Sequence, residues 1–244
     1  MRDQTSEHSA TESNAPTVVD SPILVDDPDD SIAPEALVGW PHEANLAYLA
    51  AQDVRVAASL LYQAYKHDPV FLEIFDGPKE GYEQRLRAAI REELTNFWQA
   101  EQPMVGLYNG PTLEGVVCLS RMKHGEDSGR YWHWRLKMLL TAGYVSTRQM
   151  LEKERNVAQA VPYSDYLMIS FMAVHPRYQH KGLGQLLLRA VNAVLDDYPA
   201  AEGVVALATR PEYEVFLQRQ GFVAISTIQV GSIQGTLMCL ARNT

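Results

Sequence analysis

The sequence predicts an α+β domain built around a single mixed β-sheet of about six to seven strands, with helices flanking the sheet. Two observations carry this prediction. Apolar, strand-like runs alternate with amphipathic helical patterns along residues 41–244. Within residues 165–240, a buried strand, an amphipathic helix and a second buried strand follow one another, the pattern of a βαβ unit with a parallel pair. We therefore expect one domain over residues 41–244.

Residues 1–40 differ from the rest of the chain in composition and charge. They are rich in Ser, Thr, Asp, Glu and Pro and cannot bury enough apolar surface to offset chain entropy, so we expect a disordered acidic tail. One Arg and nine acidic side chains give this tail a formal charge of −8, out of −9 for the whole chain. Its aliphatic run, SPILVDDPDD, is interpreted as part of a solvated tail; the alternative is a strand that adds to a partner's sheet edge.

Residues 41–244 are nearly neutral, with a formal charge of −1. A nucleic-acid binder needs a basic excess to neutralise phosphates, so no nucleic-acid partner is expected. No run of about 18 apolar residues and no secretory leader pattern is present, so no membrane partner is expected either. Cys118 and Cys239 lie within apolar runs without metal-ligand spacing around them. We expect two buried thiols in a reduced cytoplasm rather than a disulfide, and no metal site.

The first half of the domain is expected to contain three strands and two helices. A short strand is expected at residues 46–49, and Asp53 fits the N-cap of a helix that ends at the stop signal Asp68-Pro69. The buried positions of this helix are expected to be Val54, Ala58, Leu61 and Tyr65. The second helix has its apolar face at Tyr82, Leu86, Ile90, Leu94 and Phe97. Two strands then follow at 104–108 and 113–119. Their Asn-Gly junction predicts a hairpin, and the Pro111 after it a loop longer than two residues.

Residues 121–163 interrupt this alternation. The segment is rich in Trp, Arg and Lys and has a helical composition without a clean period. A segment of this length between two strands, with aromatic and charged side chains together, is a candidate helical insertion that forms a lid over a substrate site. The alternative is a peripheral helix pair whose Trp132 and Trp134 pack on the core.

The C-terminal third shows the clearest order. Residues 166–174 are almost continuously apolar, as expected for a strand that is buried on both faces. The following helix carries apolar side chains at helical spacing, namely Leu183, Leu186, Leu187, Ala190, Val191, Val194 and Leu195. Residues 204–207 are its parallel partner strand, and a short helix at 211–220 ends at Gly221. The final strands are expected at 222–230 and 236–241.

A glycine-containing loop lies between the buried strand and the long helix of this βαβ unit. It reads Gln179-His180-Lys181-Gly182-Leu183-Gly184. Its two glycines let the backbone approach a ligand, and the unpaired N–H groups of the first helical turn face an anion. Lys181 and His180 add positive charge at the same place. The loop therefore predicts a site for a phosphate-bearing ligand. A tight turn that simply uses glycines is the alternative, because neither the Rossmann spacing nor a Walker lysine is present.

The surroundings of this loop resemble the GCN5-related N-acetyltransferase (GNAT) family. The string MAVHPRYQHKGLGQLLL follows YLMISF and precedes FLQRQGF, and the family shows the same order of an apolar strand, an x-Pro, a Q/R-x-x-G-x-G/A loop and a later Gly-Phe. The resemblance is firm over residues 165–223 and looser over 44–119.

The resemblance implies a GNAT-like acyl-CoA-binding fold with acetyl-CoA as co-substrate. The family's pyrophosphate and pantetheine contacts carry over to ten residues: Met172, Ala173, Val174, Gln179, His180, Lys181, Gly182, Leu183, Gly184 and Gln185. The pantetheine arm is expected on the backbone of Met172 and Val174, where two parallel strands splay apart. The implied reaction is direct attack by a primary amine of a small molecule, or by an exposed amino group, on the thioester. A homodimer is left open.

Two departures from the family pattern affect the chemistry. The family's usual tyrosine, which protonates the departing thiolate, falls at Leu217, and Tyr213 lies one helical turn earlier on the same face. Tyr213 is therefore the candidate acid. No general base is assigned among three candidates, Asp165, Glu114 and His133. The alternative function is a CoA-binding module, or a catalytically degenerate relative, that acts through protein interaction.

The charge of the insertion bears on the acceptor. Residues 121–163 hold eight basic and four acidic side chains, a formal charge of +4. If this insertion forms the acceptor wall, a polycationic acceptor such as a polyamine is repelled.

Overall fold

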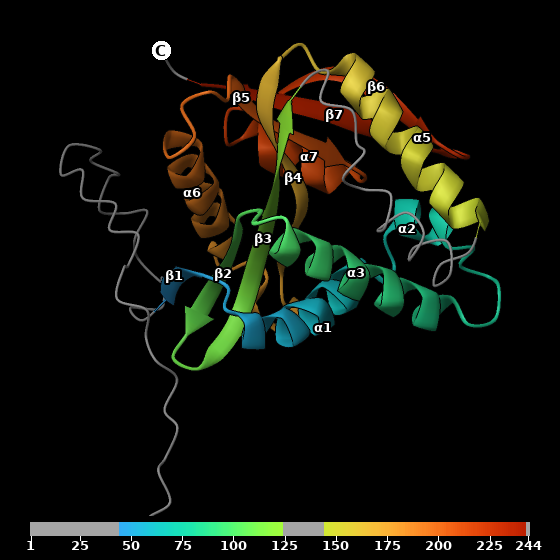
Figure 1. Ribbon diagram of the computed structural model, residues 1–244, viewed down its shortest axis with the longest axis horizontal. Coiled ribbons are helices and arrows are strands. Elements are labelled where there is room, and N and C mark those ends of the chain that lie inside the picture. Colours follow the sequence, from blue (N-terminus) through green and yellow to red (C-terminus); the bar gives the residue numbers. More distant parts are fainter. Residues whose placement is uncertain (1–43, 124–143, 243–244) are drawn as a thin grey trace, which may run out of the picture.

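The computed structural model describes residues 44–123 and 144–242 (Figure 1). The acidic tail at residues 1–40 lies outside the described residues, as do Trp132, His133 and Trp134 of the insertion.

A single seven-stranded sheet forms the centre of the molecule, with the strand order β1-β2-β3-β4-β5-β7-β6 (Figure 1). Its strands are β1 (Ala44–Tyr48), β2 (Met104–Asn109), β3 (Thr112–Lys123), β4 (Asp165–Val174), β5 (Gly203–Ala208), β6 (Val223–Val230) and β7 (Ile233–Ala241). Only β4 and β5 pair in parallel, and all other neighbours are antiparallel. The predicted fold class, a single mixed sheet flanked by helices, is confirmed.

Helices cover both faces of this sheet. They are α1 (Val54–Tyr65), α2 (Pro69–Ile74), α3 (Tyr82–Gln99), α5 (Tyr144–Ala160), α6 (Leu183–Asp196) and α7 (Pro211–Gln218). Buried side chains of α1, α2, α3 and α5 form one hydrophobic cluster against the sheet. Buried side chains of α6 and α7 form a second cluster with other residues of the strands. The core is therefore two apolar layers separated by the sheet, and together they fix where the central strands end.

Two local features differ from the predictions, both at a proline: the helix end at Asp68-Pro69 is confirmed but a second helix also begins there, and the predicted loop length at Pro111 was wrong. Asp68-Pro69 ends α1 but also begins α2, because Pro69 occupies the first turn and the Asp68 carboxylate accepts the Val70 N–H at 3.0 Å. The β2–β3 loop has only two residues, since Asn109 pairs with Thr112. Gly110 takes a φ of 54°, which allows the tight turn, and Pro111 sits where no N–H is needed.

Candidate active site

The two central parallel strands part before β4 ends. Their pairing stops at Ile169 with Ala206, whereas β4 continues to Val174. A bulge lies at the same place, because Cys118 of β3 pairs with Phe171 and Leu119 pairs with Ile169. The last residues of β4 therefore have no strand on their β5 side. This is the splay of parallel strands that the resemblance implied.

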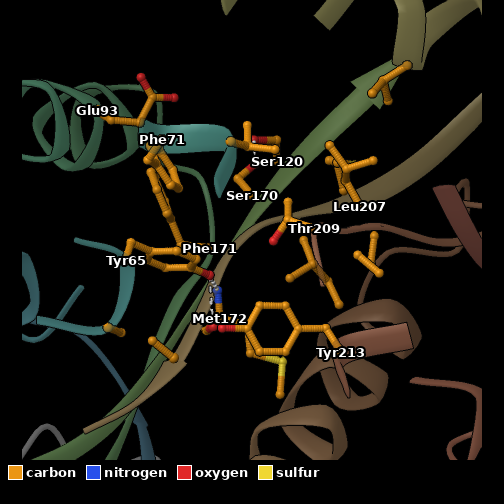
Figure 2. A pocket seen from close by; sticks show the side chains of 18 of the residues that line it. Tyr65, Phe71, Glu93, Ser120, Ser170, Phe171, Met172, Leu207, Thr209 and Tyr213 are labelled. Atoms are coloured by element: carbon orange, nitrogen blue, oxygen red, sulfur yellow. Dashed lines mark hydrogen bonds between the residues drawn. The ribbon is translucent and has the colours of Figure 1, made fainter. Parts of the chain in front are cut away.

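A cavity of about 1970 Å³ opens at this splay. One end lies at the loop before α6, which we call the anion loop (residues 179–185). The cavity then passes the backbone of Met172 and continues between β3, α2 and α3 toward Glu93 (Figure 2). The described part of the insertion contributes to this cavity through α5, whose lining residues include Met150, Lys153 and Arg155.

The anion loop exposes the N-terminus of a long helix. Gly182 is the N-cap of α6 with a φ of 80°, and His180 is also left-handed, with a φ of 61°. No side-chain hydrogen bond from the described residues caps this helix. The Gln185 N–H is bonded to the Gly182 carbonyl at 2.9 Å, which leaves the N–H groups of the residues before it to be satisfied from outside the helix. This arrangement can bind an anion.

Two other residues of the loop have structural contacts. Gln179 donates its Nε2 to the Val174 carbonyl at 3.0 Å and so ties the loop to the end of β4. A Cβ on Gly184 would lie 3.2 Å from the Phe216 ring of α7. A larger residue at position 184 would require the Phe216 ring to shift, so Gly184 favours the close packing of α6 against α7.

Tyr65 of α1 holds the backbone of Met172 on the open edge of β4. Its hydroxyl donates to the Met172 carbonyl oxygen at 2.9 Å and accepts the Met172 N–H at 3.0 Å (Figure 2). The ring faces the cavity and packs edge-on against Phe71 and Phe171, with centroid distances of 5.1 and 5.8 Å. Desolvation by burial raises the pKa of the Tyr65 hydroxyl well above its ordinary value, so the group stays protonated. We call the rings of Tyr65, Phe71 and Phe171 the aromatic wall.

Tyr213 reaches Met172 from the opposite side. It lies on α7 and lines the cavity, with its ring directed toward Met172 (Figure 2). Desolvation by burial raises its pKa above the ordinary value of 10.0, against an opposing effect of the nearby Arg210 guanidinium. Leu217, at the position of the family's usual tyrosine, is only 6% exposed and belongs to the core. Figure 2 shows the Tyr65 and Tyr213 side chains both directed toward Met172.

A buried carboxylate joins the loop after α1 to the loop after β5. Asp68 is fully buried and accepts the Thr209 hydroxyl at 2.6 Å, in addition to the Val70 N–H. Arg210 donates to the His67 carbonyl across the same junction. These contacts fix the α1–α2 loop beside the start of α7, and Thr209 itself lines the cavity.

Two of the three candidate bases lie away from the cavity, and the third is outside the described residues. Asp165 begins β4 at the end remote from the splay, and Glu114 is buried beside Asn109, whose amide donates to it at 3.2 Å. Neither lines the cavity. His133 lies outside the described residues.

The polar groups that do line the inner cavity were not singled out from the sequence. The Ser120 and Ser170 hydroxyls hydrogen-bond each other at 2.8 Å, and Glu93 of α3 lies beyond Phe71 (Figure 2). They come from three separate elements, so no local motif could have indicated them.

The remaining predictions concern cysteines, metals and membranes. Cys118 and Cys239 are both free and buried, and burial raises the pKa of the Cys239 thiol to about 11. Within residues 44–123 and 144–242, no group of three or more His, Cys, Asp or Glu side chains is placed to hold a metal ion. None of the described helices is both long and apolar enough to cross a membrane.

Residues 142–224 match the family model of the acetyltransferase (GNAT) domain. The fold is also that of solved acetyltransferases. A histone acetyltransferase HPA2 and related acetyltransferase from Corynebacterium glutamicum aligns at a TM-score of 0.63 and 15% identity, covering 83% of this chain and 98% of that one. The polyamine N-acetyltransferase of Drosophila melanogaster, which forms N-acetylagmatine, aligns at 0.60 and 16% identity, covering 82% and 100%.

A third structure was solved with a ligand. The PaiA N-acetyltransferase of Thermoplasma acidophilum, in complex with coenzyme A, aligns at a TM-score of 0.52 and 14% identity, covering 82% of this chain and 99% of that one. A search of curated proteins finds no match to the sequence. Residues 142–224 are therefore similar to a GNAT acetyltransferase domain, and the described residues share the fold of solved acetyltransferases.

Proposed function

We propose that the protein transfers an acetyl group from acetyl-CoA to a primary amine, carried by a small molecule or by an exposed amino group. The observation that supports this most strongly is a single cavity that joins an uncapped helix N-terminus to the open edge of a splayed strand. The first feature suits a pyrophosphate, and the second suits the amide-containing pantetheine arm.

The anion loop is the proposed site for the phosphates. The N–H groups at the start of α6, together with the helix dipole, favour negative charge there. The side chains of Lys181 and His180 lie on the same exposed loop, and the Lys181 ammonium adds to the positive potential. Gln185 lies on the first turn of α6 and lines the cavity. This site needs no metal ion, because backbone dipoles and side-chain cations supply the positive charge.

The backbone of β4 is the proposed site for the pantetheine arm and the thioester. The backbone groups of Met172 and Val174 point toward the missing strand, since Tyr65 and Gln179 hydrogen-bond to them there. A thioester carbonyl that accepts the Met172 N–H is polarised by it. The amine nitrogen then bonds to the carbonyl carbon as the C–S bond breaks, one proton leaves the nitrogen for solvent, and one is taken up by sulfur.

Tyr213 is the proposed donor of the proton to sulfur. Its hydroxyl faces the Met172 backbone, and its raised pKa keeps it protonated at neutral pH (Figure 2). The absence of a tyrosine at Leu217 is the observation that favours the alternative function, a CoA-binding module or degenerate relative.

The acceptor is proposed to enter along the aromatic wall. Phe171 of this wall and Ser170 of the Ser120–Ser170 pair precede Met172 along β4, whereas the anion loop follows the end of that strand. Lys153 and Arg155 of α5 line the cavity together with Glu154. The insertion as a whole has a formal charge of +4, so we expect amines with one positive charge to be acetylated ahead of spermidine. We also assign the protein to the cytoplasm, because buried thiols persist in a reducing compartment.

An amine-panel assay that follows the release of free thiol from acetyl-CoA tests this proposal. We expect thiol release that depends on one or more primary monoamines. Saturable acetyl-CoA binding without thiol release across aromatic and aliphatic amines, amino acids and peptide N-termini would instead establish the CoA-binding module. Faster turnover with spermidine than with every monoamine would refute the charge argument for the acceptor while leaving the acetyltransferase proposal in place.

A further inference from the structure

Tyr65 occupies a place on β4 that a strand or an amide ligand would otherwise take. The open edge of a strand presents an N–H donor and a C=O acceptor from the same residue, here Met172. A phenol can satisfy both groups at once, because it is a donor and an acceptor. The two hydrogen bonds of 2.9 and 3.0 Å show that Tyr65 does so.

This contact fixes where the hydroxyl lies relative to an incoming thioester. A carbonyl oxygen that accepts the Met172 N–H has to come within about 3 Å of the Met172 nitrogen. The Tyr65 oxygen is already 3.0 Å from that nitrogen. Both oxygens compete for the same N–H, so the Tyr65 oxygen has to move off the N–H direction, and a small shift leaves it beside the new oxygen, where an O–H···O hydrogen bond can form.

We propose that Tyr65 is a second hydrogen-bond donor to the thioester carbonyl oxygen, beside the Met172 N–H. This inference rests on the proposed function. The carbonyl oxygen replaces the Tyr65 oxygen as acceptor of the Met172 N–H, and the Tyr65 O–H turns from the Met172 carbonyl to the new oxygen. Negative charge that develops on that oxygen during amine attack is then held by two donors. Tyr65 gives up no proton, and the bonds made and broken are those of the transfer itself.

The surroundings of Tyr65 suit a fixed neutral donor. Its ring is held edge-on by Phe71 and Phe171, and Phe71 in turn stacks on Phe75 at 6.2 Å. The acidic and ionisable groups around it (Asp68, Tyr213 and Cys118) raise its pKa further, in addition to desolvation. The hydroxyl therefore stays protonated over the range in which an acetyltransferase works. A donor that is oriented before reaction loses little free energy to reorganisation.

Tyr65→Phe tests the inference, with Tyr82→Phe as the matched control. Both variants keep an aromatic ring and remove a hydroxyl that donates to a backbone carbonyl, since Tyr82 donates to the Lys66 carbonyl at 3.0 Å. Tyr82 does not line the cavity. We expect Tyr65→Phe to lower kcat about 10²-fold or more with little change in the Kd of CoA, and Tyr82→Phe to leave kcat unchanged.

A spectroscopic readout separates this role from simple support of the fold. The infrared C=O stretch of bound acetyl-CoA, labelled with ¹³C at the carbonyl, reports hydrogen bonds to that oxygen without any turnover. We expect the stretch to lie at a lower frequency in the wild-type complex than in the Tyr65→Phe complex. The Tyr82→Phe complex should match the wild type.

Two results would overturn the inference. One is an unchanged C=O stretch in Tyr65→Phe. The other is tighter acetyl-CoA binding with wild-type kcat, which would make the hydroxyl only an occupant that the ligand displaces. Wild-type acetyl-CoA binding is measured first, and its absence would refute the proposed function itself. If the wild type binds acetyl-CoA but acetylates no amine, the infrared comparison still decides the role of Tyr65.

Discussion

The two ends of the cavity are built by different means. The anion loop uses backbone groups within seven consecutive residues, with Gly182 and His180 in left-handed conformations to present them. The aromatic wall uses side chains from α1, α2 and β4, with Ser120 of β3 and Glu93 of α3 beyond it (Figure 2). A ligand that is the same across a family suits a backbone site, whereas an acceptor that varies suits side chains on separate elements. We therefore expect substitutions at the two ends to have separable effects.

Apart from Tyr65→Phe, the largest effect is expected where the two ends meet, at Tyr213. Tyr213→Phe should lower kcat about 100-fold, because the departing thiolate loses its proton donor. The wild-type rate should persist to alkaline pH and fall only as Tyr213 deprotonates, above its ordinary pKa of 10.0, because burial raises that pKa. The pH–rate profile of the variant should lack this alkaline limb.

Tyr48→Phe is the control for Tyr213→Phe. Tyr48 is 49% exposed, compared with 37% for Tyr213, and lies on β1 outside the cavity. Equal rates for the Tyr213 variant and the wild type at every pH would remove Tyr213 from the reaction.

The end of the cavity at the aromatic wall should lose stability when Asp68 is replaced. Asp68→Ala leaves the Thr209 hydroxyl and the Val70 N–H without their acceptor in a fully buried place, so the free energy of unfolding should fall by about 3 kcal/mol. Asp53→Ala removes the same number of hydrogen bonds, from the Ala50 N–H and the Tyr108 hydroxyl, but at a half-buried site. Asp53→Ala should lower the free energy of unfolding by about 1 kcal/mol. Urea unfolding compares the two, and equal losses would show that burial is not the cause.

At the anion loop, an added negative charge should weaken acetyl-CoA binding without lowering stability. Gln185→Glu places a carboxylate at the N-terminus of α6, which should raise the stability of the helix by about 0.5 kcal/mol. The same carboxylate repels phosphates, so the Kd of acetyl-CoA should rise about tenfold. Gln84→Glu makes the same change on the first turn of α3, outside the cavity, and should leave the Kd unchanged. Unchanged binding in Gln185→Glu would move the phosphates away from α6.

The smallest effect is expected from the acidic tail. Removal of residues 1–40 takes away a formal charge of −8, yet we assign those residues no part in either end of the cavity. At about 0.15 M salt, screening limits their influence on distant phosphates. The Kd of acetyl-CoA and kcat should both be unchanged, and a marked change in either would give the tail a role in the site.

The difference between the anion loop and the aromatic wall also explains which features the sequence could predict. The anion loop and the βαβ unit were recognisable because glycines, a proline and an apolar period lie within a short stretch. The contact of Tyr65 with Met172 joins residues 107 apart, and that of Asp68 with Thr209 joins residues 141 apart. Tyr65 was predicted only as an apolar position on a helix, because sequence spacing does not show which backbone group a hydroxyl meets in space.

Proline positions show a second limit. Asp68-Pro69 was interpreted as the end of one helix, and the structure adds that the same two residues begin another. Proline has no N–H to donate, so it cannot continue a helix, but it fits the first turn of a new one. The local pattern therefore does not show whether a helix ends or begins at a proline. At Asp68-Pro69 both occur, and the buried Asp68 accepts hydrogen bonds from Val70 at the start of α2 and from Thr209 after β5.

The central claim is that the cavity along β4 binds acetyl-CoA. Isothermal titration calorimetry of the full chain with acetyl-CoA tests it most directly. The account predicts saturable binding of one acetyl-CoA per chain, weakened in Gln185→Glu and retained in Gln84→Glu. Absence of saturable binding to the wild type, or binding that Gln185→Glu leaves unchanged, would contradict it.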